Sequence, residues 1–313
     1  MMVSAALLML GALTAVLAPR LLARAEWPER EPVVALWAWQ CVVGAVLLCF
    51  ALSMLLSAAA AWVAVRGPLF AAAPHGVVHA YGLGPREGGP WAAATALALA
   101  GGGLWTGAML TREVLRARAR KRAQGAELRF RAPLLPGEDP QGARLVVLEG
   151  PKPDAWWQPG ATPQLVVTTA ALDRLKGSQL DAVLAHEQGH VAARHDWLLH
   201  CSRALAGGFP QVPVFAAFEA EMHRLVELAA DDVASRRYGR LTIALALVGL
   251  NEDRGVFGAS PAPQAHVPQR VRRLLSAEPR LPAGRRLRLT ALATLVPAVP
   301  LVVAFVPGLT ALA

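Results

Sequence analysis

Four long apolar stretches interrupt an otherwise mixed sequence. They lie at Met2–Ala18, Pro32–Val65, Trp91–Thr111 and Leu289–Ala313. A helix needs about 20 mainly apolar residues to cross the hydrocarbon core of a bilayer. We therefore predict four transmembrane helices, at about residues 2–18, 32–65, 91–111 and 285–313.

The first and last stretches have features of their own. Met2–Ala18 lacks the basic start of a signal peptide and is followed by further apolar stretches, so we expect it to be a retained helix. The last stretch contains Pro297, Pro300 and Pro307, which predict an irregular or kinked helix.

The pattern between the third and fourth stretches is that of a small α+β domain. Short apolar or β-branched runs predict strands, and apolar residues three and four apart predict helices. The predicted strands are Leu145–Leu148 and Gln164–Thr168, and the predicted helices are Ser178–Leu199, Leu241–Leu250 and Gln269–Leu275. Gly125–Gly142, which contains proline and glycine, is expected to connect this domain to the third membrane helix.

Composition supports a membrane protein. Of the 313 residues, 55% are hydrophobic, and the mean hydropathy is +0.39. We therefore expect a mainly α-helical integral membrane protein. Its membrane region would occupy residues 1–122, a domain between the third and fourth spans residues 123–284, and the last span residues 285–313.

The arginines predict the orientation. Clusters follow the first and third apolar stretches and precede the fourth, at Arg20–Arg30, Arg112–Arg122 and Arg280–Arg288. With four spans all three clusters lie on one side, and basic residues favour the cytoplasmic side. The domain is thus expected in the cytoplasm of a multi-pass cell-membrane protein, with both chain ends outside and Arg66–Pro90 as an external loop.

The net charge of +9 has the same explanation. The basic residues gather at the predicted membrane boundaries, and no nucleic-acid-binding motif accompanies them, so we expect no direct nucleic-acid partner. The lipid bilayer is the expected partner, and its anionic lipids would attract these boundaries. Arg112–Arg122 is expected to extend the third span as a basic helix, and its charge is explained by topology without a lipid-specific site.

An H-E-x-x-H motif at His186, Glu187 and His190 indicates the chemistry. In a helix, residues four apart lie on one face, so both imidazoles can bind one zinc ion. Catalytic zinc keeps an open position, lowers the pKa of a water to about 7 and polarises a carbonyl group. Glu187 would be the general base and then the acid, which predicts peptide-bond hydrolysis.

The third zinc ligand is predicted to be Glu227. Helical spacing places His223, Glu227 and Asp231 on one face of a second helix, and a ligand histidine commonly donates its second N–H to a carboxylate. Asp231 is therefore the expected orienting group. His223 and Arg270 are candidates for an oxyanion stabiliser, and His223 is also a rival ligand; His195, His200 and His266 are weaker candidates for oxyanion stabilisation.

The two paired motifs resemble those of the membrane-embedded gluzincin metallopeptidases. The resemblance runs from about Leu145 to about Ala234 and includes both the BlaR and MecR sensor type and the HtpX and CAAX prenyl protease type. His195 replaces an aspartate common in the sensor type, which brings the chain nearer to the second type.

This resemblance implies a small sheet over the zinc helix, with an edge strand that binds extended substrate. Ala155–Trp157 and Gln164–Thr169 are the candidates for the rim of that cleft. The implied partner is a protein or peptide substrate, including a transcriptional repressor as in the sensor type. Sensor-type relatives carry a further extracellular domain, and since the chain ends at Ala313 we do not expect direct β-lactam sensing.

Two alternatives belong to other functional classes. A signalling membrane protein with a structural zinc site would have four protein ligands, with His223 as the fourth. A transporter or channel would need ionisable groups within the spans, and these stretches contain almost none. The sequence therefore favours the peptidase.

Overall fold

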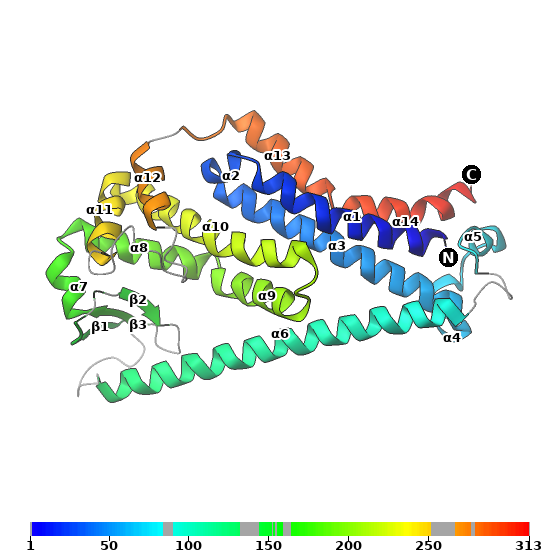
Figure 1. Ribbon diagram of the computed structural model, residues 1–313, viewed down its shortest axis with the longest axis horizontal. Helices are drawn as coiled ribbons and strands as arrows, with labels where there is room; N and C mark the ends of the chain where they lie inside the picture. Colours follow the sequence, from blue (N-terminus) through cyan, green and yellow to red (C-terminus); the bar gives the residue numbers. More distant parts are fainter. Residues whose placement is uncertain are drawn as a thin grey trace.

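A computed structural model gives the fold of residues 2–83, 90–131, 144–151, 153, 155–158, 164–251, 267–276 and 279–312. These residues form a mainly helical molecule with one small sheet (Figure 1). The apolar helices lie toward one end, where both chain termini are found, and the sheet lies at the other. His266, one of the weaker candidates for the site, lies outside the described residues.

Among the described residues, three helices are long and apolar enough to cross a membrane. They are α1 (Met2–Ala23), α3 (Pro32–Ala61) and α6 (Pro90–Arg131). Residues 32–65 do not form one helix, since α3 ends at Ala61 and α4 (Val63–Phe70) follows it. α6 runs beneath most of the length of the molecule (Figure 1).

The fourth predicted span is a bent pair of helices. α13 (Ala283–Leu295) and α14 (Ala298–Thr310) meet at an angle of 47°, and the pair counts as one span only if the bend is included. The break contains Pro297, whose ring and missing N–H prevent a continuous helix. The irregularity predicted from the prolines is confirmed.

Two expected loops are partly helical. α6 continues to Arg131, so its residues from Gly125 onward are not a connection. Within Arg66–Pro90, the chain forms the end of α4 and the short helix α5 (His75–Ala80). The Tyr81 hydroxyl, just after α5, donates a hydrogen bond of 2.8 Å to the Ala304 carbonyl of α14 and ties this segment to the apolar helices.

The three strands form a mixed sheet with the order β1-β3-β2. They are β1 (Arg144–Leu148), β2 (Ala155–Gln158) and β3 (Gln164–Thr168). β3 pairs in parallel with β1 and antiparallel with β2, so it is the central strand. The expectation that Gln164–Thr169 forms a cleft rim is therefore wrong, because both edges of β3 are already paired. β2 is an edge strand and contacts α8.

Helices cover the sheet and carry the H-E-x-x-H motif. They are α7 (Thr169–Arg174), α8 (Ser178–Ala192) and α11 (Arg240–Asn251). Ala155 and Val167 of the sheet pack with Val183 of α8 and Ala246 of α11 in one buried cluster. This cluster fixes α8 against the sheet.

The helix predicted over Ser178–Leu199 is in fact two helices. α8 ends at Ala192, and α9 (His195–Gly208) starts after Arg194. Arg194 has φ 52°, a left-handed conformation that is uncommon for a residue with a Cβ atom. This residue reverses the local helical path, so His195 does not continue the α8 spiral.

α10 (Pro213–Tyr238) joins the two ends of the molecule. Its Phe218 and Leu225 are buried in one core with Trp39 and Val46 of α3. The short helices α2 (Trp27–Arg30) and α12 (Val267–Ser276) complete this region. The metal-binding candidates on α10 are thus attached directly to the apolar helices.

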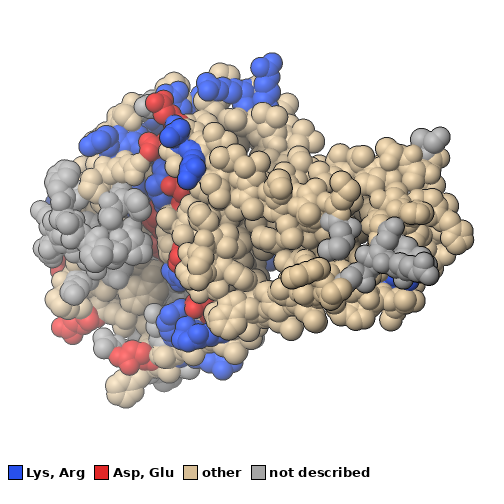
Figure 2. Space-filling model, turned by 45° about the vertical axis from the view of Figure 1, so that its right-hand side comes forward, with Lys and Arg blue, Asp and Glu red and all other residues tan. Residues whose placement is uncertain are grey.

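Charge is distributed unevenly over the surface. Figure 2 shows Lys, Arg, Asp and Glu gathered toward one end of the visible face, and a broad body of other residues beyond them. The apolar helices also expose large side chains, including Met9, Leu97, Leu104 and Phe305. Such exposure is expected of a surface that faces lipid.

Candidate metal centre

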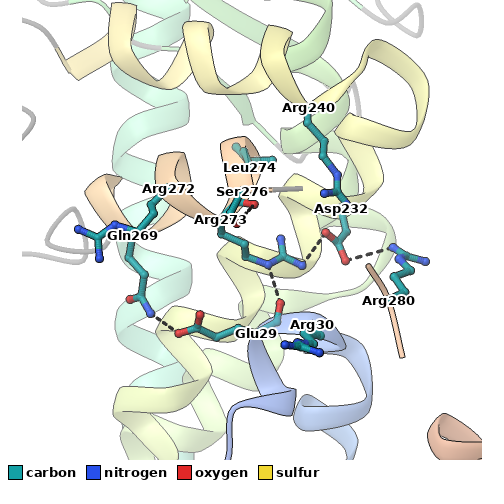
Figure 3. Close-up of a pocket in the computed structure, with 10 residues that line it drawn as sticks. All are labelled: Glu29, Arg30, Asp232, Arg240, Gln269, Arg272, Arg273, Leu274, Ser276 and Arg280. Atoms are coloured by element: carbon teal, nitrogen blue, oxygen red, sulfur yellow. Dashed lines mark hydrogen bonds and ion pairs between the residues drawn. The ribbon is translucent and has the colours of Figure 1, made fainter. Parts of the chain in front are cut away.

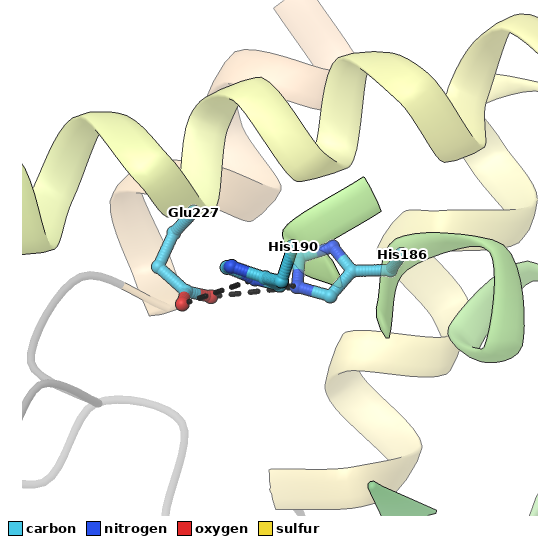
Figure 4. Close-up of side chains that lie close together, drawn as sticks. All are labelled: His186, His190 and Glu227. Carbon is cyan, nitrogen blue, oxygen red and sulfur yellow. Dashed lines mark hydrogen bonds and ion pairs between the residues drawn. The ribbon is translucent and has the colours of Figure 1, made fainter. Parts of the chain in front are cut away.

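Three predicted ligands converge between α8 and α10. His186 and His190 lie one turn apart on α8, and Glu227 reaches them from α10 (Figure 4). His186 Nε2 lies 3.1 Å from His190 Nε2, and each of these nitrogens lies 3.5 Å from an oxygen of Glu227. Among the described residues, these three are the group of side chains that could hold one metal ion.

The spacing of these atoms fits a zinc ion. Two atoms that each lie about 2.0–2.1 Å from one tetrahedral zinc ion are roughly 3.3 Å apart. The three distances in the group, 3.1, 3.5 and 3.5 Å, lie on either side of that value. Two nitrogens and one carboxylate are also a donor set of catalytic zinc sites, which leaves the fourth position open.

α8 and α10 approach each other closely at Gly189. A Cβ atom at Gly189 would lie 3.5 Å from both Ala230 Cα and Val233 Cβ of α10. That is ordinary van der Waals contact, so the space beside Gly189 would accept a methyl group without a shift of either helix.

Asp231 contacts the outer nitrogen of one ligand. His186 Nδ1 lies 3.0 Å from Asp231 Oδ1, and Asp231 is fully buried. If Nδ1 donates its proton to this carboxylate, Nε2 keeps its lone pair for a metal. This is the arrangement that the sequence predicts for Asp231.

His195 contacts the outer nitrogen of the other ligand. The two Nδ1 atoms of His190 and His195 lie 3.0 Å apart, and His195 is buried. A proton on His190 Nδ1 would be donated to His195, which would then carry its own proton on Nε2. The sequence did not predict this role, because in a continuous helix His195 would point away from His190. No local sequence pattern marks Arg194 as left-handed.

Arg270 of α12 binds two carboxylates at once. Its Nε and Nη2 donate to the two oxygens of Asp231 at 2.8 and 2.7 Å, and Nη1 lies 2.7 Å from Glu227 Oε2. The guanidinium is buried, so these contacts hold it within the protein. We interpret Arg270 as a positioning residue for Glu227 and Asp231 instead of an oxyanion stabiliser.

Burial and neighbouring charges shift the pKa values of the three candidate ligands. Burial disfavours a charged imidazole at His186, but hydrogen bonds to Asp231 and Glu227 outweigh it and raise the His186 pKa to about 9. Burial and the nearby His186 charge lower the pKa of His190 to about 4. Burial opposes ionisation of Glu227, but the hydrogen bond with His186 and the charge of Arg270 lower its pKa to about 2.

These pKa shifts apply to the three side chains before a metal binds. Near neutral pH the Glu227 carboxylate is ionised and His190 is uncharged, as metal ligands must be. His186 is protonated under these conditions, so a metal must displace its proton. The negative charge that attracts this proton would equally attract a cation.

The remaining predicted residues lie close by. Glu187 follows His186 on α8 and is partly buried, and its negative charge is among those that raise the pKa of Arg270 against the effect of burial. His223 Nε2 lies 3.4 Å from Arg203 Nη2 of α9. Within the described part of the chain, His223 is not a member of the metal-binding group.

Replacing His195 with alanine is expected to weaken zinc binding by about 10- to 100-fold, the usual effect of losing a group that orients a ligand histidine. The reason is that His190 loses the partner of its outer nitrogen. Competition with a fluorescent zinc chelator measures the affinity. His200→Ala, on the same helix but outside the group, is the control; equal affinities for the two variants would contradict the role of His195.

Comparison with known proteins gives one match. The sequence model described as Peptidase family M48 matches residues 132–215, less than half of the chain. The match contains the H-E-x-x-H motif and ends before Glu227. No curated protein and no solved structure matches the chain. Together with the His186, His190 and Glu227 group, the match shows that this region is similar to a family of zinc-dependent metallopeptidases.

Proposed function

We propose that this chain is a zinc endopeptidase of the membrane that hydrolyses peptide bonds of a protein substrate at the cytoplasmic face. The observation that carries the proposal is the convergence of His186, His190 and Glu227 at distances that suit one zinc ion. The match to Peptidase family M48 supports the same reaction independently of the distances.

The residues of the chain have distinct roles in this proposal. Bound zinc would supply a Lewis acid that polarises the scissile carbonyl group. Glu187 would take the proton of the attacking water and give it to the leaving amine. Asp231 and His195 would hold the two ligand imidazoles in orientation, and Arg270 would hold the Glu227 carboxylate.

The substrate would be an extended segment of a protein. β2 is an edge strand that contacts α8, and an unpaired strand edge can add a further strand through main-chain hydrogen bonds. Ala155–Gln158 is therefore the proposed rim of the cleft. Regulatory cleavage, for example of a transcriptional repressor, and quality control of membrane proteins are both roles for such an enzyme.

The proposed location follows from the arrangement of the helices. Both termini lie at the end of the molecule remote from the sheet and α8 (Figure 1), which is the topology expected for four spans. The arginine-rich segments around Arg116 and Arg280 flank the same domain in the sequence. Basic residues favour the cytoplasmic side, which supports a cytoplasmic metal centre.

Glu187→Gln tests the reaction. The variant is expected to bind one zinc ion per chain, as the wild type does, but to hydrolyse peptides about 10²- to 10⁴-fold more slowly, because it lacks the general base. The measurement combines metal analysis with hydrolysis of a quenched fluorescent peptide library by the full chain in detergent.

Asp181→Asn is the matched control, because it removes an exposed carboxylate from the same helix. It should keep wild-type activity. Equal activity of the Glu187→Gln variant and the wild type would overturn the role of Glu187. A zinc-loaded wild-type protein that cleaves no peptide would favour the alternative of a signalling protein with a structural zinc site.

A further inference from the structure

A second charged site lies where α12 meets α2 and the end of α10. It is a hollow of about 260 Å³, distinct from the metal group (Figure 3). Five arginines line it: Arg30, Arg240, Arg272, Arg273 and Arg280. They come from α2, α11, α12 and the segment before α13, so the fold gathers them from distant parts of the sequence. We refer to this hollow as the arginine pocket.

The carboxylates among the described lining residues do not balance these charges. Among its lining residues, Glu29 and Asp232 are the acids. Asp232 binds Arg273 at 2.8 Å and Arg280 at 3.1 Å through separate oxygens. Glu29 accepts a hydrogen bond from Gln269. Among the described residues that line the pocket, five guanidinium groups therefore face two carboxylates, and both carboxylates are already engaged.

Two arginines are available to a ligand. Arg240 and Arg272 are exposed, and neither has an ion pair or hydrogen bond of its side chain with another residue in the described ranges. Arg273 is fixed on both sides, since its Nε donates to the Glu29 carbonyl at 2.6 Å and its Nη2 to Asp232. The pocket thus combines a preorganised arginine, Arg273, with two exposed arginines, Arg240 and Arg272.

The chemistry of the pocket fits a phosphate group. Guanidinium groups offer several N–H donors in a planar fork, which matches the oxygens of a phosphate and gives short, charge-assisted hydrogen bonds. We propose that the arginine pocket binds a phosphate group, as a free anion or as the ester of a lipid headgroup. The hollow has room for an ester substituent beside the phosphate.

The position of the pocket makes a lipid headgroup a natural source. α2 connects α1 to α3, and Arg280 precedes α13, so the pocket lies at the ends of the apolar helices. A phospholipid whose chains lie beside these helices could place its phosphate there. A soluble phosphate could enter from the aqueous side, and the experiment separates the two sources.

The test measures binding to the full chain in detergent by calorimetry, with two probes. One is a short-chain phosphatidylglycerol and the other is inorganic phosphate. The Arg240→Gln/Arg272→Gln double variant is expected to bind at least about tenfold more weakly than the wild type, since it loses charge-assisted hydrogen bonds. The Arg285→Gln/Arg286→Gln variant, which removes two exposed charges from α13, should bind within about twofold of wild type.

The probes identify the source. Selective loss of phosphatidylglycerol binding in the pocket variant supports a lipid headgroup, and selective loss of inorganic phosphate binding supports a soluble anion. Loss of both supports recognition of the phosphate alone. Absence of binding by the wild type, or equal loss in both double variants, would overturn the proposal. If the double variant has a lowered melting temperature, Arg272→Gln alone is expected to show the same selective loss.

Discussion

Glu227→Gln is expected to lower zinc affinity by more than about 100-fold, beyond the usual effect of losing an outer partner of a ligand. The amide has nearly the shape of the carboxylate but no charge, so His186 and His190 alone would hold the metal. Hydrolysis should fall at least as far as in Glu187→Gln. Zinc content distinguishes the two variants, because Glu227→Gln should lose its zinc and Glu187→Gln should keep it.

Metal analysis after dialysis at low micromolar zinc distinguishes the two effects. Full zinc retention by Glu227→Gln would show that another residue supplies the third ligand. His223 is the rival from the sequence, although in the structure its Nε2 lies near Arg203. A His223→Gln variant should keep its zinc if Glu227 is the ligand, and lose it if the assignment is reversed.

The part of the site that the sequence predicts is the part set by helical periodicity. His186 and His190 are four apart on α8, and Glu227 and Asp231 are four apart on α10, so each pair shares a face. The H-E-x-x-H motif also predicts a zinc site, and such a site needs a third protein ligand. Glu227 was therefore a specific expectation. The distances between side chains of α8 and α10 could not be predicted without the three-dimensional structure.

The contacts of Arg270 and His195 could not be predicted from helical periodicity. Arg270 lies 39 residues from Asp231 along the chain, and a basic helix gives no indication of which acid it will bind. His195 reaches His190 through a single left-handed residue. Both contacts depend on backbone paths that local propensity does not determine.

The membrane helices show a related limit. Hydrophobic length located the cores of α1, α3 and α6, and the basic run predicted an extension of α6 over Arg112–Arg122, but not its continuation to Arg131. Apolar length marks the part of a helix that suits a bilayer, and a polar continuation of the same helix carries no such mark. The order of the strands was likewise beyond the sequence, because register and neighbours depend on long-range packing.

Arg270→Met is expected to destabilise the metal-free protein by about 3–5 kcal/mol, the usual cost of removing one partner of a buried ion pair. Asp231 is fully buried, and Arg270 supplies hydrogen bonds to both of its oxygens. Without Arg270, the Asp231 carboxylate would keep His186 as its neighbour but lose its largest compensating charge. The measurement is chemical unfolding in detergent, with a chelator and without phosphate.

Arg272→Met is the matched control for Arg270→Met, since it removes an exposed arginine from the same helix. Its effect should stay within about 0.5 kcal/mol. The Arg270→Met/Asp231→Asn double variant should recover part of the loss, because it removes the uncompensated charge as well. If the double variant loses more unfolding free energy than the two single variants lose together, the pair does not act through charge. Equal effects of Arg270→Met and Arg272→Met would show that Arg270 holds neither carboxylate in solution.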